Sequence, residues 1–240
     1  MRAGPARVLI VIAEPLLARL VSFELNHGTY EQRTVLGLGQ AKDIVRDWEP
    51  HLAIVDLDHK DGDPLELVAL LRPSGGRLPV IGITTKRDMR SKLRAYERGL
   101  DDLLTIPFPP EDLIAGALAV MQRVHAMHVQ FLPTIRLGEL ELDLMDEELR
   151  WRQVQLRLTA MERAIFYVFA SNPGQVVTRD QMLDLVWGSD FEPESNVIDR
   201  HIATLRTKFA ASGAPVIETI AGQGYRLNAP GLSAPGRPRQ

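Results

Sequence analysis

Residues 5–124 show short apolar runs that alternate with amphipathic segments. The apolar runs, at residues 8–12, 31–36, 52–55, 80–84 and 103–106, are typical of strands buried in a parallel sheet. The segments between and after them, at 15–27, 38–48, 64–72, 86–98 and 110–124, predict helices. A strand followed by a helix, repeated along the chain, predicts a doubly wound (βα)5 domain of the α/β class. Functional residues of such a domain gather at the carboxyl ends of its strands.

The pattern changes in the second half of the chain. Short alternating runs between residues 134 and 158 predict a small antiparallel sheet. Two capping boxes follow, Thr159 with Glu162 and Thr178 with Gln181, in which the paired side chains satisfy backbone N–H groups at a helix start. Each box therefore predicts the beginning of a helix. Further on, strands at 216–220 and 225–227 flank a turn at 221–224 and predict a hairpin.

A third helix is predicted over residues 195–209, with Ser195 or Asn196 as its N-cap. Its apolar residues return at intervals of four, three and four and form one stripe: Ile198, Ile202, Leu205 and Phe209. The opposite face is polar: Asn196, Arg200, Ala203, Thr204 and Thr207. Taken alone, this pattern also fits an ordinary surface helix. Three helices followed by a hairpin predict a winged helix-turn-helix, an α+β fold.

The chain of 240 residues is long enough for two domains, each with its own core. We place the first domain at 1–124, a linker at 125–133, the second domain at 134–228 and a disordered, proline-containing tail at 229–240. The early apolar run at 8–13 is too short to span a membrane. With 45% apolar and 25% charged residues, the composition is that of a soluble protein, and we expect a cytoplasmic location without membrane binding.

Cysteine is absent from the sequence, which excludes disulfides, thiol catalysis and zinc fingers with cysteine ligands. His125 and His128 have the spacing of metal ligands, but the sequence offers no third ligand beside them, so we expect a solvated helix end and no metal site. We found no phosphate-binding glycine loop and no hydrolase triad. We therefore expect neither an enzyme nor a bound cofactor.

The net charge of −3 hides an uneven distribution. Residues 134–228 contain ten basic and fourteen acidic residues, a net charge of −4, which is unusual for a domain that binds DNA. Residues 200–226 are the exception, with four bases and one acid: Arg200, Arg206, Lys208 and Arg226 against Glu218. Any surface that faces phosphates must therefore be local, and non-specific affinity for DNA should be modest.

Four spaced motifs carry a family resemblance. They are LTAME at 158–162, VTRDQMLDLVWG at 177–188, VIDRHIATLR at 197–206 and TIAGQGYR at 219–226. In this order they resemble the effector domain of OmpR/PhoB-type response regulators. The resemblance covers residues 134–228, and the first domain resembles the receiver domain of the same family less faithfully. It implies double-stranded DNA as a partner and a role in transcription regulation.

The receiver resemblance places Asp56 at the phosphoacceptor position and Thr84 at the position of the hydroxyl that senses the phosphoryl group. Other parts of that site are replaced. Ile12-Ala13-Glu14 stands where a receiver carries the acid pair that holds Mg²⁺, and Ile106 stands where it carries a phosphate-clamping lysine. The aromatic switch position is Leu103, and Lys60 replaces a usual proline in an acidic loop with Asp58, Asp61 and Asp63 that we expect to be solvated.

We therefore interpret Asp56 as an inactive site, a strand-end carboxylate bonded to Thr84 or to backbone N–H groups. Our hypothesis is a DNA-binding regulator that works without phosphorylation, as a homodimer on repeated half-sites. One alternative is a conventional two-component regulator phosphorylated on Asp56. Another is an interaction scaffold whose winged domain no longer binds DNA.

On the DNA surface we expect Arg200, Thr204 and Thr207 in the major groove. His201, Arg206, Lys208 and Trp187 are expected at phosphates. The wing position that commonly carries an arginine in the family is Ala221, and Tyr225 is either core or a phosphate ligand. The full set expected at DNA is Trp187, Asn196, Arg200, His201, Thr204, Arg206, Thr207, Lys208, Thr219, Gln223 and Tyr225.

The resemblance also implies contacts with proteins. Receivers of this family dimerise through charge pairs, for which the candidates here are Lys92, Asp101, Asp102, Asp112 and Arg123. Gly116 occupies a usual arginine position, so a packed apolar dimer is an open alternative. In the loop at 188–194, Phe191 and Glu192 are candidates for a contact with RNA polymerase, although an ordinary exposed acidic loop fits the sequence equally well.

Overall fold

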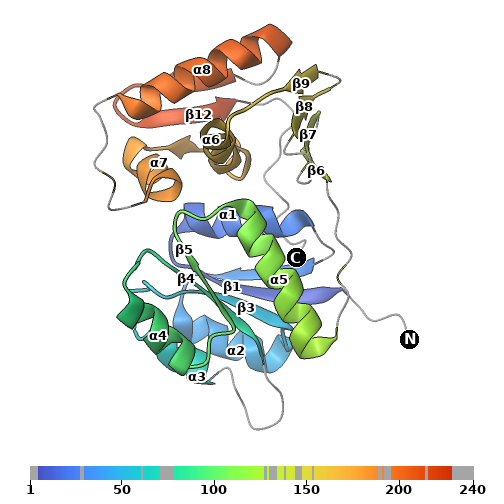
Figure 1. The fold of residues 1–240 in the computed structure, drawn as a ribbon, viewed down its shortest axis with the longest axis vertical. Helices are drawn as coiled ribbons and strands as arrows, with labels where there is room; N and C mark the ends of the chain where they lie inside the picture. The colour runs from blue at the N-terminus through green and yellow to red at the C-terminus, as the bar shows by residue number, and fades with distance from the viewer. Residues whose placement is uncertain are drawn as a thin grey trace. The chain divides into compact units, whose positions relative to one another are not determined.

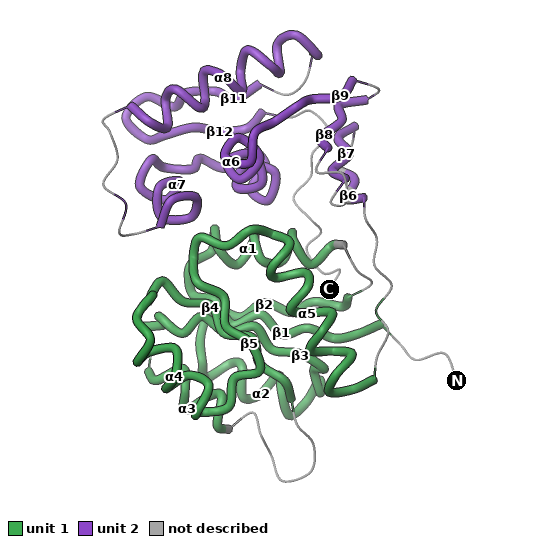
Figure 2. Tube along the Cα trace, viewed as in Figure 1, with its two compact units in different colours: residues 1–131 green, residues 132–240 purple. Residues whose placement is uncertain are grey.

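The computed structural model divides the chain into two compact units, residues 1–131 and residues 132–240 (Figure 2). It describes residues 5–27, 30–60, 62–70, 78–126, 129, 134–137, 139–143, 148–152, 154–188, 191, 196–213 and 216–228. The boundary between the two units along the chain follows Phe131, a position within the expected linker. The proposed tail, most of the linker, Asp61, His128, Glu192 and Ser195 lie outside the described residues.

Unit 1 is built on a five-stranded parallel sheet with the order β2-β1-β3-β4-β5 (Figure 1). The strands are β1 (Ala6–Val11), β2 (Tyr30–Val35), β3 (Leu52–Asp56), β4 (Val80–Thr84) and β5 (Asp102–Thr105). All five predicted strands are confirmed, with ends displaced by at most two residues. Both faces are covered, which explains why β3 and β4 read as nearly continuous apolar runs.

In the described part of unit 1, four α-helices connect the strands and a fifth follows β5 (Figure 1). They are α1 (Pro15–Glu24), α2 (Leu38–Trp48), α3 (Pro64–Leu70), α4 (Met89–Glu97) and α5 (Pro110–His125), and a short 3-10 turn, η1 (Leu25–His27), follows α1. Helices α1 and α5 lie against each other. Helices α2, α3 and α4 share one apolar core with the sheet, to which they contribute Ala41, Trp48, Leu67, Val68 and Ala95. The predicted helix over 86–98 begins later than expected, because Asp88 caps α4 through the Ser91 N–H group at 2.9 Å.

Unit 2 begins with a four-stranded antiparallel sheet in the order β6-β7-β8-β9 (Figure 1). Its strands are β6 (Thr134–Leu137), β7 (Leu140–Asp143), β8 (Glu148–Trp151) and β9 (Val154–Leu156). Alternate residues such as Leu140 and Leu142 are buried while their neighbours are partly exposed. The small antiparallel sheet predicted from the alternating runs is confirmed.

The described part of unit 2 also contains three helices and a second sheet. The helices are α6 (Ala160–Ala170), α7 (Arg179–Val186) and α8 (Val197–Ser212), and β11 (Val216–Ile220) and β12 (Gly224–Asn228) form the hairpin. Both predicted capping boxes are present. A short strand that we did not predict, β10 (Val176–Val177), pairs with β12. The result is a winged helix-turn-helix with a three-stranded wing sheet.

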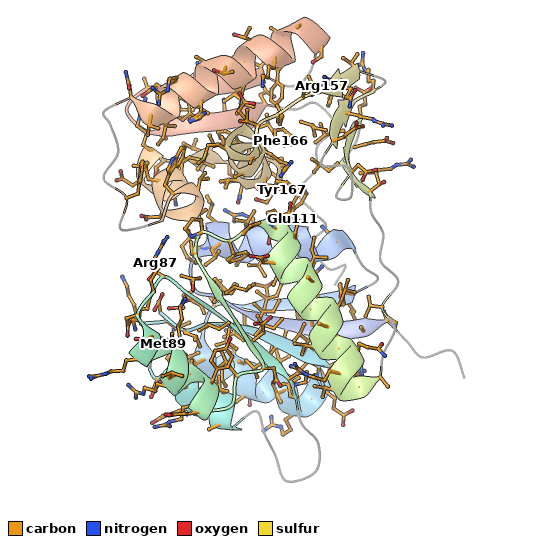
Figure 3. All side chains as sticks on the ribbon, viewed as in Figure 1. Arg87, Met89, Glu111, Arg157, Phe166 and Tyr167 are labelled. Atoms are coloured by element: carbon orange, nitrogen blue, oxygen red, sulfur yellow. The ribbon has the colours of Figure 1, made fainter. Side chains whose placement is uncertain are left out.

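The apolar stripe of α8 packs inward as predicted: Ile198, Ile202, Leu205 and Phe209 are all buried. Phe209 meets Phe166 of α6 edge to face, with ring centroids 5.6 Å apart. Figure 3 shows Phe166 among the side chains inside unit 2. Asn196 occupies the N-cap position of α8, but its side chain forms no capping hydrogen bond. The buried stripe therefore fixes which face of α8 is left to solvent.

Candidate functional sites

Asp56 is the last residue of β3 and lies at the carboxyl end of the sheet, next to Ile83 of β4 in the strand register. Its Oδ1 accepts the backbone N–H of Asp58 at 2.9 Å. Burial raises the pKa of Asp56 above that of an ordinary aspartate, and the negative charges of Asp58 and Glu14 add to this effect. Asp56 is therefore a carboxylate in an unfavourable environment for its own charge.

Asp58, two residues further on, collects the hydrogen bonds of this site. The Thr84 hydroxyl lies 3.1 Å from both carboxylate oxygens, and the Thr85 N–H and hydroxyl donate to Oδ2 at 2.5 and 2.8 Å. The Lys86 ammonium is 3.5 Å from Oδ1. Burial alone would raise the pKa of Asp58, but these hydrogen bonds and the Lys86 charge outweigh it and hold the pKa below its usual range.

These contacts decide between the two bonding alternatives for Asp56 and correct one expectation from the sequence. Thr84 donates to Asp58, so the described structure gives Asp56 a backbone N–H donor but no bond from Thr84. Asp58 is not part of a solvated loop, because only 24% of its side chain is exposed. Lys60, in contrast, is exposed. Asp58 is the candidate site residue that the sequence analysis did not single out. Its signal in the sequence was an acid two residues after the strand-end aspartate.

The residues around Asp56 do not fit a magnesium ion. Glu14, the acid that follows β1, accepts the Leu17 N–H at 2.5 Å and thereby caps α1. The Asp58 oxygens are occupied as described above, and Ile106 presents a buried aliphatic side chain at the end of β5. Among the residues that the structure describes, no cluster of three or more His, Asp or Glu side chains could hold a metal ion. The donor set that Mg²⁺ requires is not assembled here.

The second candidate site is the solvent face of α8. Asn196, Arg200, Ala203, Thr204 and Thr207 are all exposed. The Thr204 hydroxyl donates to the Arg200 carbonyl and the Thr207 hydroxyl to the Ala203 carbonyl, each at 3.0 Å. Because both hydroxyl groups are turned to the backbone, the methyl groups are available for apolar contact. This face offers one arginine and two methyl groups at helical spacing.

Lys208 does not match its expected role. Its ammonium lies 2.6 Å from Glu162 Oε2 and 2.9 Å from the Arg157 carbonyl, and the Glu162 side chain is only 4% exposed. A buried carboxylate without a cation would be costly, so Lys208 is held as its partner. We therefore withdraw the assignment of Lys208 to DNA phosphates.

Arg206 is likewise held inside unit 2. Its Nε donates to the Ile217 carbonyl and its second guanidinium nitrogen to the Thr219 hydroxyl, both at 2.7 Å. These bonds fasten α8 to β11 of the wing. The Arg206 side chain stays partly accessible, but a contact with a DNA phosphate would compete with its bonds to Ile217 and Thr219.

Tyr225 belongs to the core, which settles one of the two alternatives left open by the sequence. It is 1% exposed, and its hydroxyl donates to Asp199 and accepts from Arg179 at 2.8 Å. Arg179 also pairs with Asp199 at 2.9 Å, so the three side chains connect α7, α8 and β12. Burial and the Asp199 carboxylate raise the pKa of Tyr225 to about 12. Its role as a phosphate ligand is withdrawn.

The remaining expected residues lie in the turn of the wing and around the end of α7 and the start of α8. Ala221 and Gln223 are exposed in the turn between β11 and β12. The Trp187 ring stacks on Phe191 at a centroid distance of 6.0 Å and approaches His201 at 5.8 Å. Phe191 itself is 40% exposed. The aromatic cluster of Trp187, Phe191 and His201 thus joins the end of α7 to the start of α8.

Comparison with known proteins identifies both units. Residues 8–117 match the family described as "Response regulator receiver domain", and residues 153–227 match "Transcriptional regulatory protein, C terminal". The response regulator MprA of Mycobacterium sp. (strain KMS) is 30% identical over 224 residues, which is 93% of this chain and 97% of that protein. The chain belongs to the OmpR/PhoB-type response regulators. Its C-terminal unit is the DNA-binding domain of that family.

Other relatives extend over both units in the same way. The transcriptional regulatory protein TrcR of Mycobacterium tuberculosis is 28% identical over 95% of this chain and 88% of its own. The solved structure of the response regulator DrrB, a Thermotoga maritima OmpR/PhoB homologue, is 24% identical, covers 94% of this chain and 100% of its own, and has a TM-score of 0.42.

Within the described part of the present chain, no helix combines the length and apolarity needed to cross a membrane.

Two of the expected dimerisation residues are bonded to each other within the receiver. The Arg123 guanidinium lies 3.8 Å from Asp101 Oδ1 and 3.3 Å from the Asp101 carbonyl. The Asp101 side chain is 0% exposed, and its Oδ2 accepts the Val80 N–H at 3.0 Å. Asp101 therefore anchors β4 and α5 inside the domain, which corrects its expected role as an intermolecular partner.

The other expected dimerisation residues remain partly accessible: Lys92, Asp102 and Asp112. A side chain at Gly116 would place its Cβ 2.8 Å from Asp102 Oδ2, so glycine lets β5 and α5 approach closely here. Helix α4 adds an exposed apolar stripe, Met89, Leu93 and Tyr96, at the helical spacing of one face. Figure 3 marks Met89 near the start of this helix.

Proposed function

We propose that this response regulator is a sequence-specific transcription regulator that binds double-stranded DNA through α8 and does not depend on phosphorylation of Asp56. The observation that carries the second half of this proposal is the arrangement around Asp58. Its carboxylate already holds the Thr84 hydroxyl and both donors of Thr85. The Thr84 hydroxyl is the donor that the receiver resemblance assigns to a phosphoryl group on Asp56.

Electrostatics supports the same conclusion. Phosphorylation replaces the single negative charge of Asp56 with about two on the phosphoryl group, and unit charges about 4 Å apart near a protein surface repel by about 4 kcal/mol. Asp58 and Glu14 already act unfavourably on the charge of Asp56. Lys86 is a nearby cation, 3.5 Å from Asp58, and its single charge offsets only part of this repulsion. Without a metal donor set, most of the repulsion that a phosphoryl group would meet remains.

The DNA half of the proposal rests on the exposed face of α8. An arginine such as Arg200 can pair with both acceptors of a guanine, and the methyl groups of Thr204 and Thr207 can meet thymine methyl groups. His201 and Trp187 approach each other near the start of α8 and suit phosphates. Asn196, Thr219 and Gln223 are exposed and remain proposed DNA contacts. Arg206 remains a second-rank phosphate candidate because of its bonds to β11.

The low positive charge of this domain favours a dimer. One winged domain should bind weakly, and two domains on adjacent half-sites gain affinity by linkage. We propose a homodimer that uses the receivers, in which the α4 stripe and Lys92, Asp102 and Asp112 are candidate contacts. Phe191 and Glu192 remain proposed contacts with RNA polymerase, and the cytoplasm, where the DNA lies, is the proposed location.

The test is DNA affinity of the full chain by fluorescence anisotropy on sequences selected from a random library. We expect a preferred sequence, with equal dissociation constants for wild type and for Asp56→Asn, with or without acetyl phosphate and Mg²⁺. Asp43→Asn is the matched control, because Asp43 is an exposed acid on α2 of the same unit. Truncation to residues 132–240 should weaken binding to a full site.

Two results would contradict the proposal in different ways. A phosphodonor that tightens DNA binding in wild type and in Asp43→Asn, but not in Asp56→Asn, would indicate a conventional phosphorylated regulator. Binding that shows no sequence preference and disappears at moderate salt would favour the interaction scaffold, since purely electrostatic contacts are screened.

A further inference from the structure

A cavity of about 560 Å³ opens within unit 1, between the loop after β3, the end of β4 and α4. Its apolar lining includes Leu57, Leu65 and Leu103, and its polar lining includes Thr85, Lys86 and Arg94. Figure 3 labels Arg87 and Met89, which lie just before and at the start of α4. The volume lies in the range of pockets that hold small organic ligands, which combine an apolar wall with a few polar groups.

The acids of the cavity are already satisfied within the receiver. Asp58 accepts from Thr84 and Thr85, and Asp63 accepts the Leu65 N–H at 2.9 Å at the start of α3. Their charges are therefore committed to local structure. A ligand gains little from a positive group placed against them.

The cations of the cavity are bound more loosely. The Lys86 ammonium stands 3.5 Å from Asp58, and an Arg94 nitrogen stands 4.0 Å from Asp63. Both side chains are about three-fifths exposed, at 60% and 61%. An arginine carries five N–H donors and a lysine three, so these contacts leave donors for a further acceptor. The charged groups of the cavity that can still bind a ligand are therefore the cations Lys86 and Arg94.

We propose that this cavity binds a small amphipathic organic anion. Its acidic group takes the N–H donors of Lys86 and Arg94, and its apolar body packs on Leu57, Leu65 and Leu103. The site goes beyond the proposed function, because DNA binding does not require it. Asp58 and Thr84 line the same cavity. A bound ligand therefore lies next to the hydrogen bond between Thr84 and Asp58, on which the proposed independence from phosphorylation rests.

The probe is 1-anilinonaphthalene-8-sulfonate, an aromatic anion that fluoresces in apolar sites, with N-phenyl-1-naphthylamine as its neutral counterpart. On the full chain we expect saturable binding of the sulfonate with one site per chain. Arg94→Gln and Lys86→Gln should each weaken the sulfonate by about fivefold, the upper range for an exposed charge pair, and leave the neutral probe unchanged. Arg90→Gln, an exposed change on the same helix outside the cavity lining, should alter neither.

The apolar wall is tested by Leu103→Phe, which places a larger side chain in the cavity. It should weaken both probes by about tenfold, comparable to losing the burial of roughly two methylene groups. Leu93→Ala is the control for the exposed α4 stripe and should not change binding. Circular dichroism and a thermal melt verify that each variant is folded, and the two glutamine variants keep the test decisive if Leu103→Phe does not fold.

The proposal is overturned if the sulfonate binds Arg94→Gln and Lys86→Gln as tightly as wild type. It is also overturned if Leu93→Ala abolishes the signal, because the probe would then report the outer stripe. DNA binding of the same variants is measured separately. Loss of sequence preference there would count against the proposed function and not against the cavity.

Discussion

Asp56 and Asp58 lie two residues apart, and we predict that neutralising them has opposite effects on the stability of the receiver. Asp58→Ala removes the acceptor of the buried Thr84 hydroxyl and of the Thr85 N–H. Each buried donor left without a partner costs about 1–3 kcal/mol, and water entering at the partly open site recovers some of that. We expect a loss of about 2–4 kcal/mol. Asp58→Asn keeps one acceptor oxygen and should lose less.

Asp56→Asn should instead raise stability at pH 7. Burial raises the pKa of Asp56 in the folded chain, so its ionised form opposes folding above that pKa, and the cost vanishes below the unfolded value of about 3.9. The pKa of Asp58 is lowered, so its contribution is present above the unfolded value and is lost as the pH falls through the folded pKa. The free energies of unfolding of the Asp56 and Asp58 variants should therefore differ most from wild type at pH 7 and approach it in acid.

The assay is urea unfolding at pH 7 and again in acid, followed by the fluorescence of Trp48, which is buried in unit 1. The other tryptophans, Trp151 and Trp187, belong to unit 2 and are replaced by Phe in all variants so that the signal reports the receiver alone. Asp43→Asn again serves as the exposed control. Equal destabilisation by Asp56→Asn and Asp58→Asn would refute the reasoning, because both carboxylates would then be structural acceptors of the same kind.

Three predictions concern the DNA-binding unit. Lys208→Met should lower the stability of unit 2 by about 2 kcal/mol, since it leaves the buried Glu162 without its cation, and the salt dependence of DNA binding should not change; a smaller salt slope with unaltered melting would restore its phosphate role. Arg200→Ala should cost about 1–3 kcal/mol of DNA affinity and relax the preference at one base pair, which binding to randomised half-sites would reveal; an unchanged preferred sequence would contradict it. Ala221→Arg should strengthen binding to A·T-rich flanks, where the minor groove is narrow, and an equal gain on G·C-rich flanks would count against the placement of the wing.

The elements of both units were predictable because their apolar residues repeat with regular spacing. The stripe of Ile198, Ile202, Leu205 and Phe209 fixed both the helix and its buried face. The capping boxes marked two helix starts correctly. Such signals are local, so they can be read without knowing what the segment packs against. Strand ends were less exact, and the two-residue β10 has no pattern of its own.

The contacts that define the sites were not predictable in the same way. Thr84 meets Asp58 because the loops after β3 and β4 lie side by side, 26 residues apart in the chain. Lys208 reaches Glu162 across 46 residues. Periodicity places a side chain on a face but does not say which distant group it meets. The sequence therefore predicted Lys208 as a phosphate ligand, although its ammonium is already paired with the buried Glu162 carboxylate.

The most direct test of phosphorylation independence is the intact mass of the full chain after incubation with acetyl phosphate and Mg²⁺. Wild type, Asp56→Asn and Asp58→Asn are compared under the same conditions. The arrangement of Asp58, Thr84 and Ile106 predicts that wild type gains no phosphoryl group above the level seen in Asp56→Asn. A magnesium-dependent gain of one phosphoryl mass in wild type that is absent from Asp56→Asn would contradict it.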